Sequence, residues 1–212
     1  NNRRDMATIP SGIHLSVMNI VPLIAQQLDK ILLFHYLGAA QVAVYSFSVA
    51  IPDQLKSVLK GLQTIIIPKF AQTETQKVKE SISAKMLPLI GILMLVSLSY
   101  FFAAKYVYLI FFPAYMASVP YSQVYGISII AFALILPHSL LQAKLATREL
   151  YQFNGIRALA QIAFLVVGAY TMGIWGVVIA RVLSDFCAFG TLFIVTHRYR
   201  EPSSLQSFLE ER

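Results

Sequence analysis

The sequence predicts an all-α integral membrane protein, and three of its properties lead to this fold class. Of the 212 residues, 57% are hydrophobic and only 13% are charged, and the mean hydropathy is +0.65. A soluble domain has about 25% charged residues, so this chain has too few to cover a globular surface. Several segments are apolar over the roughly 20 residues that a helix needs to cross a bilayer. These segments lack a two-residue alternation, which favours helices over the strands of a membrane barrel.

Six spans are expected, and together they form one six-transmembrane-helix lobe over residues 1–212. The first two are separated by a short linker that contains Gly38, and the last two by little more than Gly173, which predicts a tight hairpin. The six spans cover residues 13–34, 43–67, 82–103, 121–143, 155–172 and 174–196.

The distribution of Lys and Arg between the spans predicts the orientation of the lobe. On the opposite side of the membrane the only base is Lys105, in the linker at residues 104–120. Cytoplasmic loops are enriched in Lys and Arg, so both termini are expected in the cytoplasm. The bases on the cytoplasmic side are Arg3, Arg4, Lys69, Lys77, Lys79, Lys85, Lys144, Arg148, Arg198, Arg200 and Arg212.

Eight Asp, Lys and Arg residues lie inside the expected spans, apart from Lys85, which is counted with the cytoplasmic linker before the third span. A charge at the bilayer centre costs about 2.5 to 3.5 kcal/mol on insertion scales, so such residues should face protein or water and mark a pathway. Bases exceed acids in this set, and a cationic cavity favours an anionic cargo, with phosphate or pyrophosphate as the obvious group. The eight residues are Asp29, Lys30, Asp53, Lys56, Lys60, Arg157, Arg181 and Asp185.

The second span carries the clearest polar stripe. At 100° per residue, Asp53, Lys56 and Lys60 project close to one line, together with Ser and Thr side chains, while the other faces are apolar. Pro52 removes a backbone donor near the middle of this span and should kink it. A kinked helix lining a cavity is therefore expected here.

The first span has a similar polar stripe that ends in Asp29 and Lys30. The shorter Asp29 side chain is expected to face the cavity. Lys30 has two interpretations, because its long side chain could face the cavity or extend to the outer membrane interface.

The last two spans contain the remaining charges. Arg181 and Asp185 are four residues apart, so they can pair along one helix face, as a structural or a functional ion pair. Arg157 lies near the cytoplasmic end of the fifth span and is expected to reach lipid headgroups. Small residues recur every fourth position in the sixth span and predict close helix packing. These small residues are Gly176, Ala180, Ser184 and Ala188.

The chain shows no pattern typical of an enzyme, so no catalytic residue is predicted. It has no phosphate-binding loop for ATP and no nucleophile elbow, and its four His residues have no metal-ligand spacing. The single Cys187 lies in an apolar run and is expected to pack. No metal, cofactor or nucleic-acid partner is therefore expected, although the net charge is +7.

Two stretches resemble a known family. The segment from Gln27 to Ser46 has an Asp before an apolar run, then Leu-Gly, then Tyr-Ser, and Phe111-Phe-Pro-Ala-Tyr115 precedes a further helix. Together with Pro68, these are similar to the C-terminal half of bacterial polysaccharide flippases. Those proteins are the O-antigen and exopolysaccharide translocases of the multidrug/oligosaccharidyl-lipid/polysaccharide exporter superfamily.

The resemblance implies a function and several partners. The chain would be the C-terminal lobe of a multi-pass transporter in the bacterial cytoplasmic membrane, paired with a missing N-terminal lobe. It would flip a polyprenyl-pyrophosphate-linked oligosaccharide between leaflets for surface polysaccharide synthesis, driven by a proton or sodium gradient, with a polysaccharide polymerase as a further candidate partner. The resemblance carries Asp29, Asp53, Lys56 and Lys60 over as cavity residues, whereas Arg181 and Asp185 rest on the physical argument.

Two alternatives remain. A multidrug efflux half of the same superfamily would export amphipathic cations, and the excess of bases argues against it. A non-transporting structural subunit of a polysaccharide assembly complex predicts that the polar stripes form buried ion pairs.

Overall fold

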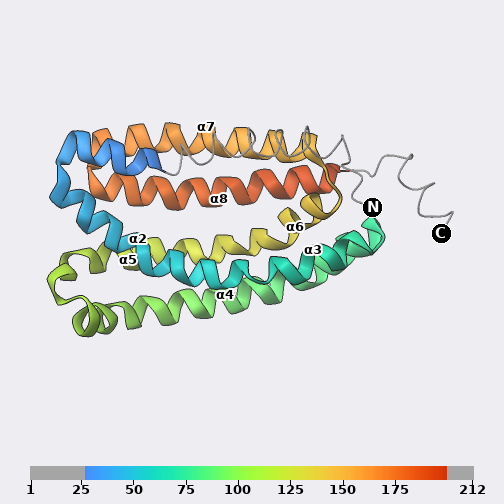
Figure 1. Ribbon diagram of the computed structural model, residues 1–212, viewed down its shortest axis with the longest axis horizontal. Coiled ribbons are helices and arrows are strands. Elements are labelled where there is room, and N and C mark those ends of the chain that lie inside the picture. The colour runs from blue at the N-terminus through green and yellow to red at the C-terminus, as the bar shows by residue number, and fades with distance from the viewer. Residues whose placement is uncertain (1–26, 200–212) are drawn as a thin grey trace, which may run out of the picture.

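The computed structural model of the protein describes residues 27–199, and every regular element in that part of the chain is a helix. The predicted all-α class is thereby confirmed for these residues. The long helices run side by side along the longest axis of the molecule (Figure 1).

The elements follow one another with short turns. A helix at residues 27–37 is followed by Gly38 and then by α2. The next two elements are α3 and the long α4. A run of shorter helical pieces, η1, α5, η2 and α6, leads to the final pair, α7 and α8. Their bounds are α2 Ala39–Lys60, α3 Gln63–Ala71, α4 Thr75–Phe111, η1 Pro113–Ser118, α5 Val119–Gly126, η2 Ile127–Leu134, α6 Ile135–Ala143, α7 Thr147–Met172 and α8 Ile174–Arg198.

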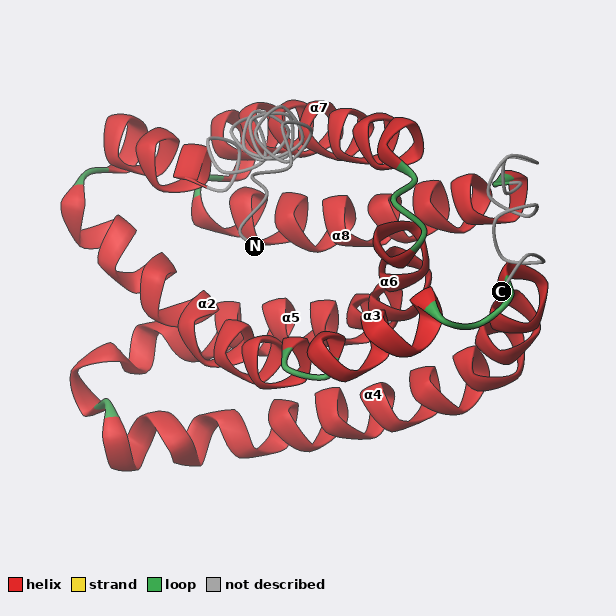
Figure 2. Ribbon diagram, turned by 45° about the vertical axis from the view of Figure 1, so that its right-hand side comes forward, coloured by secondary structure: helices red, strands yellow, loops and turns green. Residues whose placement is uncertain are grey.

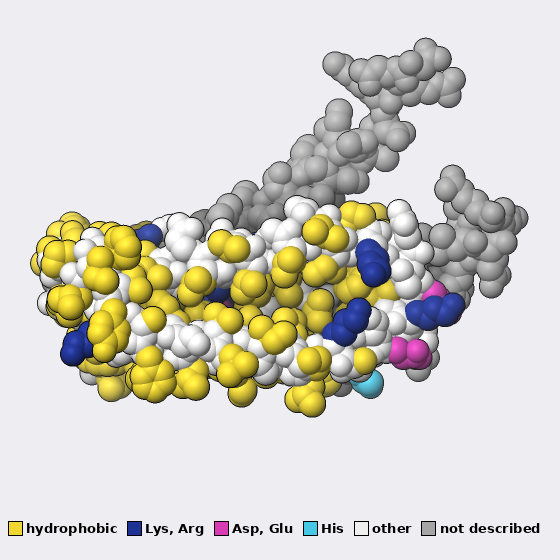
Figure 3. All heavy atoms as spheres, turned by 90° about the horizontal axis from the view of Figure 1, so that it is seen from below, with side chains coloured by type: hydrophobic (Ala, Val, Ile, Leu, Met, Phe, Trp, Pro, Cys, Tyr) yellow, Lys and Arg dark blue, Asp and Glu magenta, His cyan; other side chains and the backbone are white. Residues whose placement is uncertain are grey.

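Four of the described helical segments are long and apolar enough to cross a membrane: Thr75–Phe111, Pro113–Ala143, Thr147–Met172 and Ile174–His197. Only 17% of the most apolar stretch of the first is buried, against 61% in the second. Hydrophobic side chains cover much of the face seen in Figure 3. A surface this apolar suits lipid rather than water, which indicates a multi-pass membrane protein.

The region expected as the first two spans is described in part. Residues 27–34 of the first span are helical, and residues 13–26 lie outside the described residues. The second span, expected at residues 43–67, is divided between α2 and α3. Gly61 and Leu62 form the turn between them, with backbone hydrogen bonds to residues three earlier. Glycine disfavours the helix interior and permits this break.

The other helices differ from expectation mainly at their ends. The long helix α4 continues to Phe111, so the linker expected at residues 104–120 is itself largely helical. The break falls at Phe112, whose φ of −139° leaves the helical region because Pro113 follows it. The helix α7 begins at Thr147, well before the expected residue 155.

Two distant ends of the molecule are defined by contacts between turns. At one end, the methyl groups of Leu37 lie beside Gly173. At the other, the Lys144 ammonium donates to the carbonyl of Thr73 at 2.9 Å and the Lys79 ammonium to that of Tyr199 at 2.6 Å. Apart from the turn at Gly61–Leu62, successive turns alternate between the two ends, as Figure 2 shows. The positions of residues 1–26 and 200–212, including the termini, lie outside the described residues.

The helices α7 and α8 form the expected hairpin at Gly173, whose φ of +58° lies in the region that glycine tolerates best. A Cβ added at Gly168 would overlap the backbone of Gly176 on the facing helix. The small residues expected to allow close packing, Gly176, Ala180, Ser184 and Ala188, are all buried. Their role in helix packing is confirmed.

The helix α2 changes direction along its length in both ribbon views (Figures 1 and 2). It contains one proline, the buried Pro52. A proline inside a helix removes a hydrogen bond and its ring displaces the preceding turn, so Pro52 accounts for the bend. The bend brings the C-terminal half of α2 toward α5 and α8.

Candidate functional site

A cavity of about 750 Å³ lies among α2, α3, α5, η2, α6, α7 and α8. Its size falls within the range of roughly 300 to 1,000 Å³ that is usual for ligand sites. Six charged side chains line it: Asp53, Lys56, Lys60, Arg157, Arg181 and Asp185. Four of them are bases and two are acids, so the wall carries an excess of positive charge.

The three charged residues of α2 reach this wall because they repeat every third or fourth position on one helix face. Asp53, Lys56 and Lys60 all line the cavity, with Gln63 and Ile67 of α3 continuing the same side. The structure thus brings together the polar stripe that the sequence predicted in the second span.

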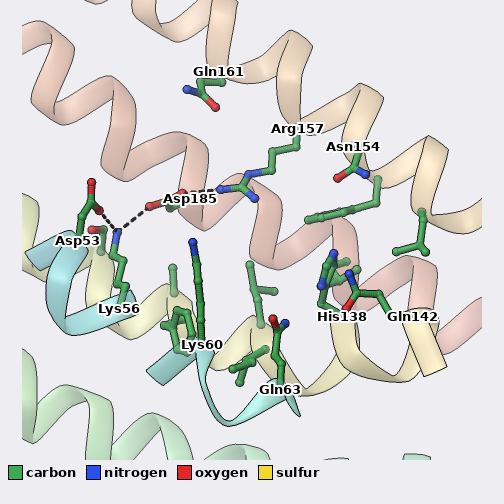
Figure 4. Close-up of a pocket in the computed structure, with 18 of the residues that line it drawn as sticks. Asp53, Lys56, Lys60, Gln63, His138, Gln142, Asn154, Arg157, Gln161 and Asp185 are labelled. Atoms are coloured by element: carbon green, nitrogen blue, oxygen red, sulfur yellow. Dashed lines mark hydrogen bonds and ion pairs between the residues drawn. The ribbon is translucent and has the colours of Figure 1, made fainter. Parts of the chain in front are cut away.

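A chain of ion pairs crosses the cavity from α2 to α7 (Figure 4). The Lys56 ammonium lies 3.7 Å from the Asp53 carboxylate and 3.3 Å from that of Asp185 on α8. The other oxygen of Asp185 lies 3.3 Å from the Arg157 guanidinium on α7. Lys56 is therefore held between two acids, and Asp185 between two bases.

Tyr125 of α5 completes the surroundings of Lys56. Its hydroxyl donates to the Asp53 carboxylate at 2.8 Å and accepts from the Lys56 ammonium at 3.3 Å. The same ammonium lies 4.5 Å from the centre of the Tyr125 ring. Because the Lys56 side chain is only 12% exposed, these partners replace most of its hydration.

Arg181 has a partner that the sequence did not indicate. Its spacing from Asp185 allows a pair along α8, but its guanidinium lies 2.8 Å from the carboxylate of Asp29, on the helix at residues 27–37. The same Asp29 oxygen accepts a hydrogen bond of 2.5 Å from the Tyr45 hydroxyl. The Asp29 side chain is only 3% exposed and does not line the cavity. Asp29 therefore lies behind Arg181 and positions it.

Two lysines differ sharply from Lys56. Lys30 is half-buried on the helix at residues 27–37 and does not line the cavity. Lys60 lines the cavity and is exposed, and within the described residues its ammonium has neither an ion pair nor a hydrogen bond. Lys60 is therefore the lining base whose charge is available to a ligand.

Arg157 was expected to reach lipid headgroups, and the structure corrects this. Its side chain lines the cavity and pairs with Asp185. A periodic pattern in the sequence could have indicated this position. Polar residues at successive intervals of three and four positions share one face of α7, and all of them line the cavity: Asn154, Arg157 and Gln161. His138 and Gln142 form a similar pair on α6. No place in the site was predicted for Asn154, Gln161, His138 or Gln142.

No group of His, Cys, Asp and Glu in the described residues has the arrangement of a metal site. Cys187 is exposed on α8 rather than packed inside, which corrects the expectation for this residue. Comparisons with family models, curated proteins and solved structures find no match to this chain. The geometry of the cavity is thus the basis for any functional conclusion.

Proposed function

We propose that the chain is one lobe of a secondary transporter that moves an anionic, lipid-linked oligosaccharide across the bacterial cytoplasmic membrane. The observation that supports this most is the cavity itself, which places four bases and two acids inside an apolar helical bundle. Ionisable residues at membrane depth are costly, so their convergence on one cavity favours a substrate pathway. The excess of positive charge favours an anion.

The proposed topology has six spans with both termini in the cytoplasm. The helix at residues 27–37 and the bent α2 would complete the first two spans beside the four apolar segments. The turns alternate between two ends of the molecule, as six antiparallel spans require. The resemblance to polysaccharide flippases adds a second lobe and a polyprenyl-pyrophosphate cargo to this proposal.

The pyrophosphate would bind at Lys60. This base has no partner within the described residues, and Arg157 on the facing helix pairs with a single acid. An ammonium and a guanidinium donate charge-assisted hydrogen bonds to phosphate oxygens, which are stronger than neutral ones. Lys56 and Arg181, by contrast, hold the cavity wall together through their buried acids.

A structural subunit without a transport path is the second candidate function. The ion pairs of Lys56 and of Arg181 favour it, because they satisfy most of the buried charge internally. Lys60 and the volume of the cavity favour transport. A multidrug efflux half would need an acidic cavity, and the lining has more bases than acids.

Export of surface polysaccharide in a strain that lacks its own flippase tests the proposal. Lys60→Arg should retain export, because the positive charge remains, whereas Lys60→Glu should abolish it by repelling the phosphates. Lys105→Glu is the matched control, because it makes the same charge change on the exposed surface of α4. Export that is equal for Lys60→Glu and Lys105→Glu, at equal membrane expression, would favour the structural subunit.

A further inference from the structure

The cavity has a second, uncharged polar region beside its charged wall. Gln63 of α3, His138 and Gln142 of α6 and Asn154 of α7 all line the cavity. In Figure 4 the last three lie beyond Arg157, on the side away from Asp53 and Lys56. The His138 ring is 5.8 Å from that of Phe153, so α6 and α7 are in contact here.

The three amide side chains in this region are free to bind a ligand. Within the described residues, Gln63, Gln142 and Asn154 make no side-chain hydrogen bond, although each is partly buried. Each amide offers a carbonyl acceptor and an NH₂ group with two donors. A half-buried amide without a partner loses hydration and gains nothing in return, so such groups are usually satisfied by water or ligand.

The chemistry of these groups indicates what they would bind. A phosphate has only acceptors and is better held by Lys60 and Arg157, which have only donors. A hydrocarbon chain would leave the amides without hydrogen-bond partners, which is unfavourable for buried polar groups. A group dense in hydroxyls both donates and accepts, as the amides do, and so matches this region. A sugar residue is such a group.

We propose that Gln63, Gln142 and Asn154 form a saccharide subsite, contiguous with the phosphate-binding bases Lys60 and Arg157. This inference rests on the proposed function and makes it more specific. The cargo would lie along the cavity with its phosphates between α2 and α7 and its first sugar against α6 and α7. The uncharged region would then select among cargoes by their sugar, while the bases hold the part that all cargoes share.

Two kinds of soluble probe test this in the full-length protein in nanodiscs. The first is farnesyl pyrophosphate. The second is the same molecule carrying one glucose, galactose or N-acetylglucosamine on its terminal phosphate. At least one sugar should bind about five-fold more tightly than farnesyl pyrophosphate itself, the gain expected from one or two hydrogen bonds.

Substitutions then show which residues cause the tighter binding of the sugar-bearing probe. Gln142→Ala and Asn154→Ala should each remove it, with affinity for farnesyl pyrophosphate unchanged, which also shows that the variant is folded. Lys60→Gln should weaken all probes by the same factor. Gln152→Ala is the matched control, because this amide is exposed on α7 and does not line the cavity.

Each other outcome overturns the subsite. If no sugar improves binding, or if the amide variants keep the gain, the region does not bind saccharide. If those variants weaken all probes equally, the amides serve the fold or the phosphate. In these cases the proposed function stands as long as farnesyl pyrophosphate binds and Lys60→Gln weakens it. Failure of every probe to bind the unaltered protein would overturn both proposals.

Discussion

The Arg181 guanidinium and the Asp29 carboxylate form an ion pair of 2.8 Å between residues 152 positions apart in the chain. The pair joins α8 to the helix at residues 27–37, and the Tyr45 hydroxyl on α2 donates to the same carboxylate oxygen. Three helices thus meet at one buried acid. Arg181 is thereby fixed at the cavity wall by residues that do not themselves line it.

Removing one partner of this pair should destabilise the protein strongly. The Asp29 and Arg181 side chains are 3% and 15% exposed, so Asp29→Asn leaves a largely buried cation without its counterion. Such a loss costs about 3 to 5 kcal/mol, whereas apolar replacement of both partners is often nearly neutral. Thermal unfolding in detergent should therefore show a large drop for Asp29→Asn and a recovery in Asp29→Leu/Arg181→Leu.

An exposed ion pair provides the control for this prediction. Glu74 and Lys77 lie 3.0 Å apart with side chains 62% and 73% exposed, so Glu74→Gln should leave the unfolding temperature nearly unchanged. Equal effects of Asp29→Asn and Glu74→Gln would contradict the central place given to the buried pair.

Lys56 and Lys60 should separate stability from ligand binding. Lys56 neutralises Asp53 and Asp185, so Lys56→Gln should lower the unfolding temperature by leaving two acids close together. Lys60 has no such partner within the described residues, so Lys60→Gln should leave stability unchanged and weaken pyrophosphate binding about ten-fold. Calorimetric unfolding and titration with farnesyl pyrophosphate measure the two effects. A reversed pattern would assign the ligand to Lys56.

The sequence predicted the helical class and the polar face of α2 well, because both depend on local composition and periodicity. Asp53, Lys56 and Lys60 share one face at helical spacing, and that face lines the cavity. The division of the second span at Gly61 was missed, since hydropathy continues through the break. The two helices are separated by a turn at Gly61, and a single glycine in an apolar segment is only weak evidence for a helix break.

The partners of the charged residues could not be predicted from spacing. Arg181 and Asp185 are four apart on α8, yet each is paired with residues from other helices. Tertiary packing determines which distant helix lies beside Arg181 and Asp185. Residue spacing within one helix does not predict that packing. The same limit applies to Arg157. Its position near the end of the expected fifth span predicts contact with lipid headgroups, whereas tertiary packing places Asp185 of α8 beside it.

The contact between Gly168 and Gly176 predicts a selective effect of added methyl groups. A Cβ at Gly168 would overlap the Gly176 carbonyl, so Gly168→Ala should force α7 and α8 apart and lower the unfolding temperature by several degrees. Gly155, on the same helix, has open space around it, so Gly155→Ala should be neutral or stabilise by up to about 1 kcal/mol. A stable Gly168→Ala variant would show that the two helices do not pack as closely as described.

The proposed topology places the two ends of the molecule on opposite sides of the membrane, and cysteine labelling can test this. Ala117 is exposed at the end that contains the turn after α4, and Gln76 is exposed at the other end, near Lys79. Cys187 is itself exposed, so Cys187→Ala provides the background for both single substitutions.

In intact cells, a membrane-impermeant maleimide should label Ala117→Cys and spare Gln76→Cys until the membrane is permeabilised. The expected direction follows from the bases of the described residues, because Lys69, Lys77, Lys79 and Lys144 lie in or beside the turns at the Gln76 end. Lys30 and Lys105 lie on helices that lead to the turns at the other end. Labelling of Gln76→Cys alone in intact cells would show that the lobe has the opposite orientation. The part of the cavity lined by Gln142 and Asn154 would then lie toward the outside of the cell. Labelling of both sites in intact cells would contradict a membrane-spanning arrangement of these helices, and with it the transport proposal.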